Sequence, residues 1–241
     1  MADLQPKSFF KKNWKLLVGA ALLLLFLILV VLLKTVDVAI NPETDTKIGL
    51  STVNFAVHNA IGEHYALYDL TQYLGYFAIL VAAGFAVWAC ARLLFSRFSF
   101  RKTGIDFLIL GGLYLAAVLC YAFFEIVIVN CRPVLLEGKA EASFPSSHTV
   151  LSIIVFVSAA RMLHRRFALR VRYLFFSLPF YALAAFAAVA RLVSGVHWLT
   201  DVIGGVLLSV ALLFFFSFFS DLVPVDSDEK KETETEKVAH A

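Results

Sequence analysis

The sequence predicts an all-α, polytopic membrane protein with about six transmembrane helices. Three observations carry this prediction: the composition, the number of long apolar segments and the distribution of basic residues. The 241-residue chain is 61% hydrophobic and 16% charged, whereas soluble domains are about half apolar and about a quarter charged. The mean hydropathy of +0.83 indicates a surface that faces lipid. The net charge of +3 is too small to predict a nucleic-acid partner.

Six apolar segments are candidates for membrane spans, which need about 20 mostly apolar residues each. The first follows four lysines and is longer than the apolar region of a cleaved signal peptide, so we expect an uncleaved signal anchor. Pro179 interrupts the fifth, which a membrane helix tolerates as a kink. The segments are Trp14–Leu33, Tyr73–Leu94, Phe107–Val129, Thr149–Leu163, Tyr173–Ala190 and Val202–Phe219.

Basic residues cluster before the first segment, between the second and third, and between the fourth and fifth. Cytoplasmic loops of membrane proteins carry the excess of Lys and Arg, so we expect both termini in the cytoplasm and the alternate loops outside. The clusters are Lys7, Lys11, Lys12 and Lys15; Arg92, Arg97, Arg101 and Lys102; and Arg161, Arg165, Arg166, Arg170 and Arg172.

The chain is expected to form one membrane-embedded domain over residues 1–221. The tail, residues 222–241, has mixed charge and almost no apolar content, so it cannot offset the entropy cost of ordering and is expected to be disordered in the cytoplasm. The longest outside segment runs from Asp37 to Asp69. Its mildly amphipathic part, Ile48 to Ile61, fits either a helix lying on the membrane surface or an ordinary loop over the helix ends.

Two other outside loops, which follow the third and fifth apolar segments, hold most of the remaining polar residues. Ionisable groups at the ends of membrane helices are costly and are candidates for function. Because the two loops lie on the same side of the membrane, we expect their polar residues to form one site. These residues are Arg132, Ser146, Ser147, His148, Arg191, His197 and Asp201.

This set of residues suits phosphoryl transfer, in which negative charge spreads over the phosphate oxygens. Arg132 and Arg191 can each grip two oxygens with a planar fork. His197 and Asp201 are four residues apart, so the carboxylate could fix the imidazole tautomer and leave the other ring nitrogen to attack phosphorus. His148 is then available to protonate the leaving oxygen.

Ser146 and Ser147 precede His148 where the fourth apolar segment begins. A serine at a helix start offers a hydroxyl group, and the first backbone N–H groups of the helix are free to bind an anion. Both serines are therefore candidate phosphate-binding residues.

The same residues resemble the three motifs of the type-2 phosphatidic acid phosphatase (PAP2) superfamily, which also includes the vanadium haloperoxidases. The family motifs are Lys-x6-Arg-Pro, Pro-Ser-Gly-His and Ser-Arg-x5-His-x3-Asp. This chain has Arg132-Pro133, Pro145-Ser146-x-His148 and Arg191-x5-His197-x3-Asp201, in the same order. The direct resemblance covers about Glu125 to Gly205.

The resemblance implies a haloperoxidase-like helical core in the membrane-integral, lipid phosphatase branch of the family. It implies His197 as the nucleophile that forms a phosphohistidine, Asp201 as its orienting partner and His148 as the general acid. It assigns phosphate binding to Arg132, Arg191 and Ser146, and implies no metal and no cofactor.

The sequence departs from the family pattern at three positions. Glu125 stands where the family has lysine; if the helix continues, it shares a face with Arg132 and could pair with it or repel a phosphate. Lys139, in the same loop, is a candidate to supply the missing cation. Ser147 replaces the motif glycine but keeps its backbone N–H, and Ala190 replaces the serine before the motif arginine.

The predicted function is hydrolysis of a lipid phosphate or diphosphate at the outer face of the cell membrane. Polyprenyl diphosphate, phosphatidylglycerophosphate and phosphatidic acid are all compatible. Two alternatives remain: a phosphotransferase that uses the same intermediate, and a catalytically poor relative that binds a lipid phosphate. A transporter is disfavoured because the polar residues avoid the membrane midplane.

Three neighbours of the motifs also carry expectations. Trp198 is expected to anchor the chain at the membrane interface. Gly204 and Gly205 are expected to allow close helix packing beneath the site.

Overall fold

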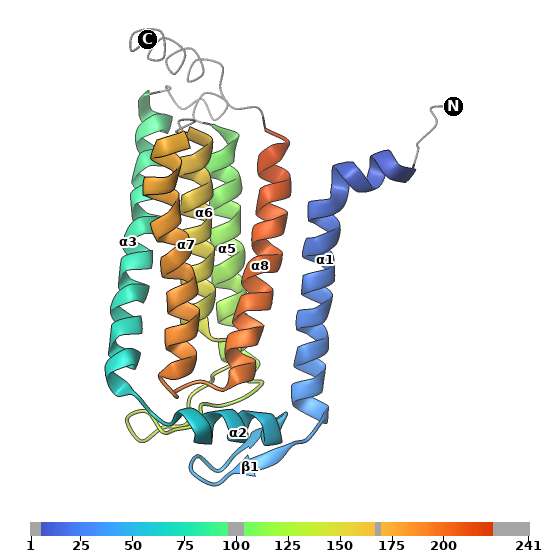
Figure 1. Cartoon of the computed structure of the whole chain (residues 1–241), viewed down its shortest axis with the longest axis vertical. Coiled ribbons are helices and arrows are strands. Elements are labelled where there is room, and N and C mark those ends of the chain that lie inside the picture. Colours follow the sequence, from blue (N-terminus) through green and yellow to red (C-terminus); the bar gives the residue numbers. More distant parts are fainter. Residues whose placement is uncertain (1–5, 96–103, 167–169, 224–241) are drawn as a thin grey trace.

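The computed structural model describes residues 6–95, 104–166 and 170–223. Long helices run side by side and form a bundle, and short elements cover one end of it (Figure 1). The long helices are α1 (Pro6–Thr35), α3 (Tyr65–Phe95), α5 (Ile105–Ile126), α6 (Ser147–Arg166), α7 (Arg170–Val193) and α8 (Leu199–Asp221). The prediction of an all-α membrane fold is confirmed.

Five of these helices, α1, α3, α5, α6 and α8, are long and apolar enough to cross a membrane. In α7 the apolar part, Ser177–Val193, is shorter, and the helix continues through Pro179. Each helix coincides with one of the six predicted segments. The largest differences are at the starts of α1 and α3, which lie eight residues before the predicted Trp14 and Tyr73.

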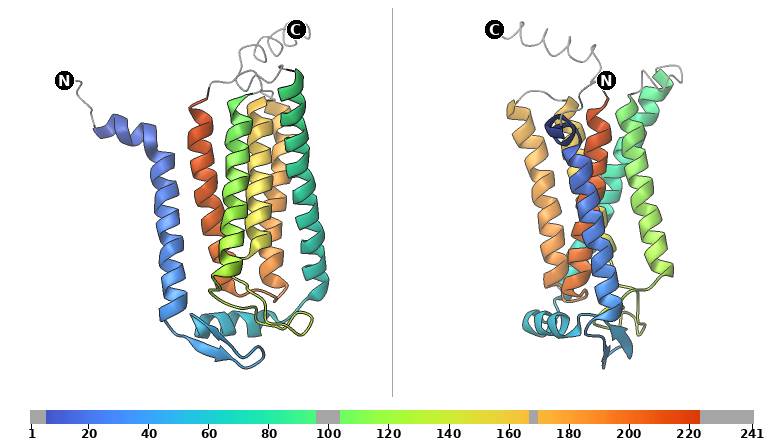
Figure 2. Two further views of the ribbon diagram at one scale, coloured as in Figure 1. Left: turned by 180° about the vertical axis from the view of Figure 1, so that it is seen from behind. Right: turned by 90° about the vertical axis from the view of Figure 1, so that its right-hand side faces the viewer.

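A two-stranded hairpin and a short helix close the end of the bundle where α1 finishes. Strands β1 (Ala39–Asn41) and β2 (Thr46–Ile48) pair antiparallel, and α2 (Ser51–Ile61) lies across the ends of the long helices (Figures 1 and 2). Asp37 fixes the start of α2: its carboxylate accepts the Thr52 N–H at 2.7 Å, as an N-terminal helix cap does. This segment is therefore helical, and the helix packs over the ends of the long helices.

Helix α6 forms the centre of the bundle and packs against α3, α5, α7 and α8. Its buried face includes the small residues Ala159 and Ala160, both fully buried, and small residues let membrane helices approach closely. By contrast, α1, α3 and α5 turn many large apolar side chains outward. This arrangement explains why the predicted span for α6 was the shortest: its polar residues, such as Ser152 and Ser158, are buried against protein.

Close packing at Gly204 and Gly205 is confirmed. A Cβ atom at Gly204 would lie 2.4 Å from the Phe144 ring, and one at Gly205 would lie 3.0 Å from Cβ of Thr149. Any side chain there would push away the loop and the helix start that carry Ser146.

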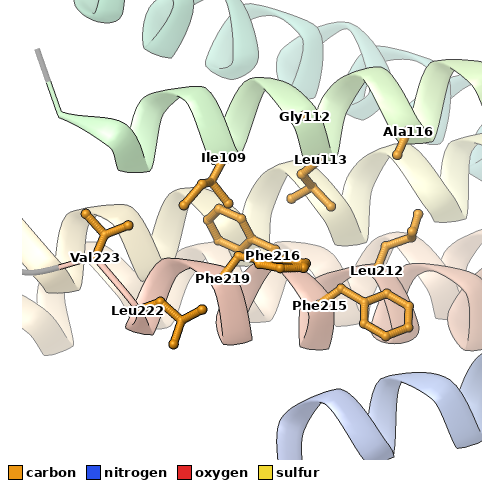
Figure 3. Close-up of a pocket in the computed structure, with 10 residues that line it drawn as sticks. All are labelled: Ile109, Gly112, Leu113, Ala116, Leu212, Phe215, Phe216, Phe219, Leu222 and Val223. Carbon is orange, nitrogen blue, oxygen red and sulfur yellow. The ribbon is translucent and has the colours of Figure 1, made fainter. Parts of the chain in front are cut away.

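An apolar groove of about 620 Å³ lies between the first half of α5 and the second half of α8 (Figure 3). Its lining runs along α8 from Leu212 and ends just past the helix at Val223. With a rise of 1.5 Å per residue, Leu212 is already about 16 Å along the helix axis from Asp201. The groove is therefore separate from the polar residues at the other end of the bundle.

At that far end, Asp221 pairs with Lys15 and with Arg161, and lies 3.7 Å from Arg165. The described members of the three predicted basic clusters thus share one end of the bundle, opposite α2. The charged tail lies outside the described residues from residue 224 onward.

Candidate active site

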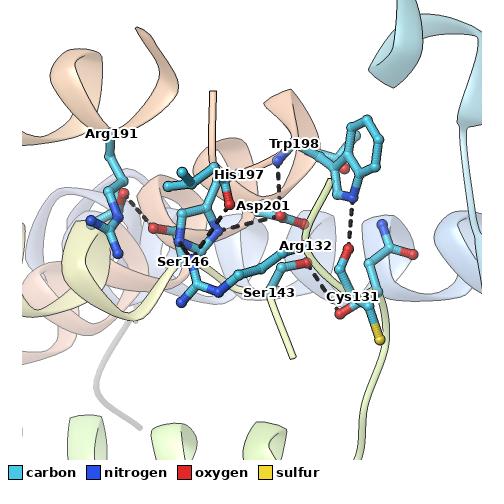
Figure 4. Close-up of polar contacts among 12 residues, drawn as sticks. Cys131, Arg132, Ser143, Ser146, Arg191, His197, Trp198 and Asp201 are labelled. Carbon is cyan, nitrogen blue, oxygen red and sulfur yellow. Dashed lines mark hydrogen bonds and ion pairs between the residues drawn. The ribbon is translucent and has the colours of Figure 1, made fainter. Parts of the chain in front are cut away.

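The predicted catalytic and phosphate-binding residues converge at the end of the bundle that α2 covers. They come from the loop between α5 and α6, the start of α6, the end of α7, the loop between α7 and α8 and the first turn of α8. Figure 4 shows the charged and polar side chains of these segments turned toward one another.

His197 lies in the short loop between α7 and α8, and only 3% of the residue is exposed. Its Nε2 is 2.9 Å from a terminal nitrogen of Arg132. A guanidinium can only donate, so Nε2 must accept. Nδ1, which then carries the proton, lies 3.4 Å from Oδ2 of Asp201. The tautomer therefore leaves the Nε2 lone pair directed at Arg132.

The surroundings also keep the His197 ring neutral. Burial lowers the pKa of His197 well below its ordinary value, and the charges of Arg132 and Arg191 lower it further. A hydrogen bond to the backbone of Ser143 acts in the opposite direction and is the smaller effect. A neutral imidazole with a free lone pair is the form that a nucleophile needs.

Asp201 is fully buried in the first turn of α8. Its Oδ2 accepts the backbone N–H of Trp198 at 3.0 Å, which is the N-terminal capping contact of that helix. The same oxygen faces Nδ1 of His197. Helix capping therefore fixes the carboxylate that orients the histidine.

Arg132 reaches His197 from the loop after α5 and is held from two sides. Its Nε lies 3.1 Å from Oε2 of Glu141, and a terminal nitrogen donates to the carbonyl of Val196 at 3.4 Å. The backbone N–H of Arg132 also donates to the carbonyl of Glu141 at 2.9 Å. Glu141 is therefore the carboxylate partner of this arginine.

Arg191, near the end of α7, is fully buried. One terminal nitrogen donates to Oγ1 of Thr71 at 2.7 Å, and the other donates to Nδ1 of His148 at 3.2 Å. The guanidinium lies 4.9 Å from the centre of the Tyr68 ring. Because Nδ1 of His148 accepts this bond, its Nε2 carries the ring proton in the substrate-free site.

Ser146 is fully buried, and its Oγ accepts a hydrogen bond from the Thr149 hydroxyl at 3.0 Å. Its backbone N–H was expected to be free for an anion, but it donates to the carbonyl of Asp201 at 3.1 Å. Ser147 is the first residue of α6 and is partly exposed. The Ser146 backbone therefore joins the two histidine-bearing segments, and only its hydroxyl remains for the predicted role.

Glu125 and Lys139 are both exposed and lie apart from this cluster. The condition for Glu125 to share a helical face with Arg132 is not met, because α5 ends at Ile126 and the chain leaves the helix. Lys139 forms a tight turn with Leu136 through backbone hydrogen bonds of 3.0 and 3.1 Å. Neither residue contacts the histidines or arginines of the site in the part of the chain that the structure describes.

Trp198 was expected to anchor the chain at the membrane interface, but its side chain is buried and connects two loops of the site. The residue is 1% exposed, and its indole N–H donates to the carbonyl of Cys131 at 2.7 Å. Phe55 and His58 of α2 pack against its ring, with centroids 5.3 and 5.4 Å away. Trp198 thus links the loop of His197 to the loop of Arg132, and α2 packs against its ring.

Asn54, a fully buried residue of α2, was not predicted as part of the site. Its side chain donates to Oγ1 of Thr200 at 2.9 Å and accepts the Thr200 backbone N–H at 3.2 Å. It thereby fixes the start of α8, one residue before Asp201. The only sequence signal was a polar residue in an amphipathic segment, which fits any surface helix.

Both a protein family and a solved membrane-protein structure are similar to this chain. Residues 125–222 match the model of the PAP2 superfamily, and this region contains the predicted catalytic and phosphate-binding residues. A search of curated proteins gives no match. Among solved structures, the chain resembles the crystal structure of the first transmembrane PAP2 type phosphatidylglycerolphosphate phosphatase from Bacillus subtilis. The TM-score is 0.63 and the identity 20%, with 86% of this chain and 97% of that chain covered. Residues 125–222 thus resemble the PAP2 superfamily, and the fold of the chain is similar to that of a transmembrane PAP2 type phosphatase.

Proposed function

We propose that the protein is a phosphatase that hydrolyses a lipid phosphate or diphosphate through a covalent phosphohistidine on His197. One observation carries the proposal: the Nε2 lone pair of His197 is directed at the Arg132 guanidinium at 2.9 Å, while Asp201 faces the other ring nitrogen. A phosphate that binds to Arg132 would therefore meet an oriented, neutral nucleophile.

Substrate binding would prepare both histidines for the first step. Phosphate oxygens are stronger acceptors than imidazole nitrogens, so the substrate would take the N–H groups of Arg132 and Arg191. Nε2 of His197 is then released to attack. Nδ1 of His148 is released as well and can take up a proton, which gives an imidazolium with a second proton on Nε2.

In the first step, the lone pair of His197 Nε2 forms a bond to phosphorus as the bond from phosphorus to the leaving oxygen breaks. His148 donates its Nε2 proton to that oxygen and becomes neutral. In the second step, His148 accepts a proton from water, the water oxygen bonds to phosphorus, and the P–N bond breaks. The arginines stabilise the charge on the phosphate oxygens in both steps.

The position of the site supports a lipid as the substrate. The cluster lies at one end of a bundle whose outer helices expose large apolar side chains. A lipid whose tail remains in the bilayer would present its phosphate at this level. The neighbour from Bacillus subtilis is described as a phosphatidylglycerolphosphate phosphatase, which makes that lipid one member of the test panel, beside phosphatidic acid and a polyprenyl diphosphate.

We propose further that the site faces the outside of the cell membrane. The described basic residues Lys15, Arg161 and Arg165 lie at the opposite end of the bundle, and Lys and Arg are enriched on the cytoplasmic side. A single cysteine in place of Lys139, in an otherwise cysteine-free protein, tests this orientation because Lys139 is exposed in the loop that carries Arg132. An impermeant thiol reagent should label it from outside; labelling only from the cytoplasm would overturn the orientation.

The activity is tested with detergent-purified protein, the lipid panel and a chelator, with His197→Ala as the inactive variant. The matched control is His64→Ala, since His64 is exposed and its ring bonds only to the nearby carbonyl of Ile61 in the described structure. Release of phosphate that persists with chelator and is lost in His197→Ala alone supports the proposal. Release that survives in His197→Ala would overturn the phosphohistidine mechanism.

The same experiment separates the alternatives. A transferase would form a phosphorylated product when an alcohol acceptor is added, at the expense of free phosphate. A binding relative would retain labelled lipid without releasing phosphate. The ordered contacts of His197 support turnover over binding alone, because binding needs no oriented nucleophile.

A further inference from the structure

Three residues of α3 line the side of the site that none of the three motifs supplies. Tyr68, Thr71 and Gly75 are spaced by three and four residues, so they lie on one face of the helix. All three contact residues of the site: Tyr68 and Thr71 contact Arg191, and Gly75 contacts His148. They also lie outside residues 125–222, the part of the chain that matches the family.

Thr71 is a preset acceptor for Arg191. Its hydroxyl donates its proton to the carbonyl of Tyr68 at 2.7 Å, so an oxygen lone pair remains for the guanidinium N–H, also at 2.7 Å. Thr71 is 2% exposed and Arg191 is fully buried, so water does not replace this contact easily. The bond fixes the plane of the guanidinium, and with it the direction of its remaining donors.

Gly75 sets the position of the His148 ring. A Cβ atom at residue 75 would lie 2.9 Å from Cδ2 and 3.2 Å from Nε2 of His148. The ring edge that carries the reactive Nε2 therefore rests directly on the backbone of α3. The opposite edge is held by Arg191 through Nδ1, so the ring cannot move away from an added methyl group without losing that contact.

We propose that Thr71 and Gly75 are positioning residues for the phosphatase reaction. Thr71 holds Arg191 as a phosphate clamp, and Gly75 determines where His148 presents its proton to the leaving oxygen. The inference rests on the proposed function, and it assigns to α3 a part in catalysis that acts through other residues.

The Gly75 assignment is tested by the leaving-group dependence of Gly75→Ala. Dioctanoyl phosphatidic acid releases an alkoxide, which needs a proton, whereas p-nitrophenyl phosphate releases a stable anion. General acid catalysis contributes about 10²- to 10⁴-fold, so a displaced His148 should lower kcat/KM for the lipid by about tenfold or more. The loss with p-nitrophenyl phosphate should be less than about threefold, because that reaction depends little on the acid.

Gly84→Ala is the matched control, since Gly84 lies on the same helix and a Cβ atom there would meet nothing within 4 Å. Both substrates should react at the wild-type rate in this variant. Equal losses for both substrates in Gly75→Ala, or no loss at all, would overturn the positioning role while the proposed function stands. If the wild-type protein hydrolyses neither substrate nor the wider lipid panel, the proposed function fails and the Gly75 assignment fails with it.

The Thr71 assignment is tested without turnover, by binding of orthovanadate as a phosphate mimic. Thr71→Val keeps the shape of the side chain and removes the acceptor, so the Kd for vanadate should rise by roughly tenfold, as expected for a lost hydrogen bond to a charged group. Thr71→Ser keeps the hydroxyl and should retain wild-type affinity. Unchanged affinity in the valine variant, or equal weakening in both variants, would overturn this assignment.

Discussion

Asparagine in place of Asp201 removes one negative charge next to His197 and leaves the shape of the side chain unchanged. The amide oxygen can still accept the backbone N–H of Trp198, which now bonds to Oδ2 of Asp201 at 3.0 Å. The start of α8 should therefore remain capped. What the variant loses is the attraction between the carboxylate and the histidine ring when that ring becomes positive.

The magnitude follows from the distance between the two groups. Oδ2 of Asp201 lies 3.4 Å from Nδ1 of His197, and at an effective dielectric constant of about 20 the attraction between unit charges at that distance is about 5 kcal/mol. The ring is neutral before attack and gains positive charge as Nε2 bonds to phosphorus, so this attraction acts on the transition state. Because each 1.36 kcal/mol changes a rate about tenfold, kcat should fall by about 10³- to 10⁴-fold with little change in KM.

The assay is a single-turnover reaction with radiolabelled lipid phosphate, quenched at intervals and analysed for label on the protein. Asp201→Asn should form the phosphohistidine slowly and bind substrate normally. Glu137→Gln makes the same chemical change at an exposed loop residue and should behave as wild type. Formation of the intermediate in Asp201→Asn within about tenfold of the wild-type rate would refute the electrostatic argument.

Three further predictions concern the stability of the site, measured by thermal unfolding in detergent. Asn54→Ala leaves the buried polar groups at the start of α8 without partners and should lower the free energy of unfolding by about 1–3 kcal/mol. An unchanged Tm would contradict the role of Asn54 in holding the start of α8. Gly204→Ala should also cost about 1–3 kcal/mol by overpacking against Phe144, whereas Gly112→Ala, which meets nothing within 4 Å, should not. Since burial holds the pKa of His197 well below 6.5, the unfolded chain binds a proton there that the folded protein does not. That contribution to the free energy of unfolding is present above pH 6.5 and falls by about 1.4 kcal/mol per pH unit below it. The Tm should therefore decline less on acidification in His197→Gln than in wild type. Equal declines of Tm with pH in the two proteins would contradict this prediction.

The sequence predicted the parts of the molecule whose physics is expressed locally. A helix that faces lipid needs a long apolar segment, so α1, α3, α5 and α8 were visible from hydropathy alone. Charged residues at the ends of such helices are costly without a role, and this made Arg132, Arg191 and His197 stand out. The spacing of four residues between His197 and Asp201 predicted their contact, which the structure contains.

The unpredicted contacts are those that depend on where a helix ends. The seven-residue spacing of Glu125 and Arg132 predicts a shared face only while the helix continues, and α5 ends between them. The pairing of Arg132 with Glu141 depends instead on the path of the following loop. Thr71 precedes the apolar segment that begins at Tyr73, so it looked like an ordinary polar flank, and only the packing of α3 against α7 brings it to Arg191.

The two arginines explain how the site can be both stable without substrate and reactive with it. Each one donates to an imidazole nitrogen, Arg132 to His197 and Arg191 to His148. Among the described residues no carboxylate pairs with Arg191, although it is fully buried, and a buried cation without a counter-ion is costly. A bound phosphate would supply that counter-ion, and in taking the N–H groups it would release both ring nitrogens. Under the proposed function, binding and activation would be one event, since the arginine contacts that hold the histidines would be the ones that recognise the substrate.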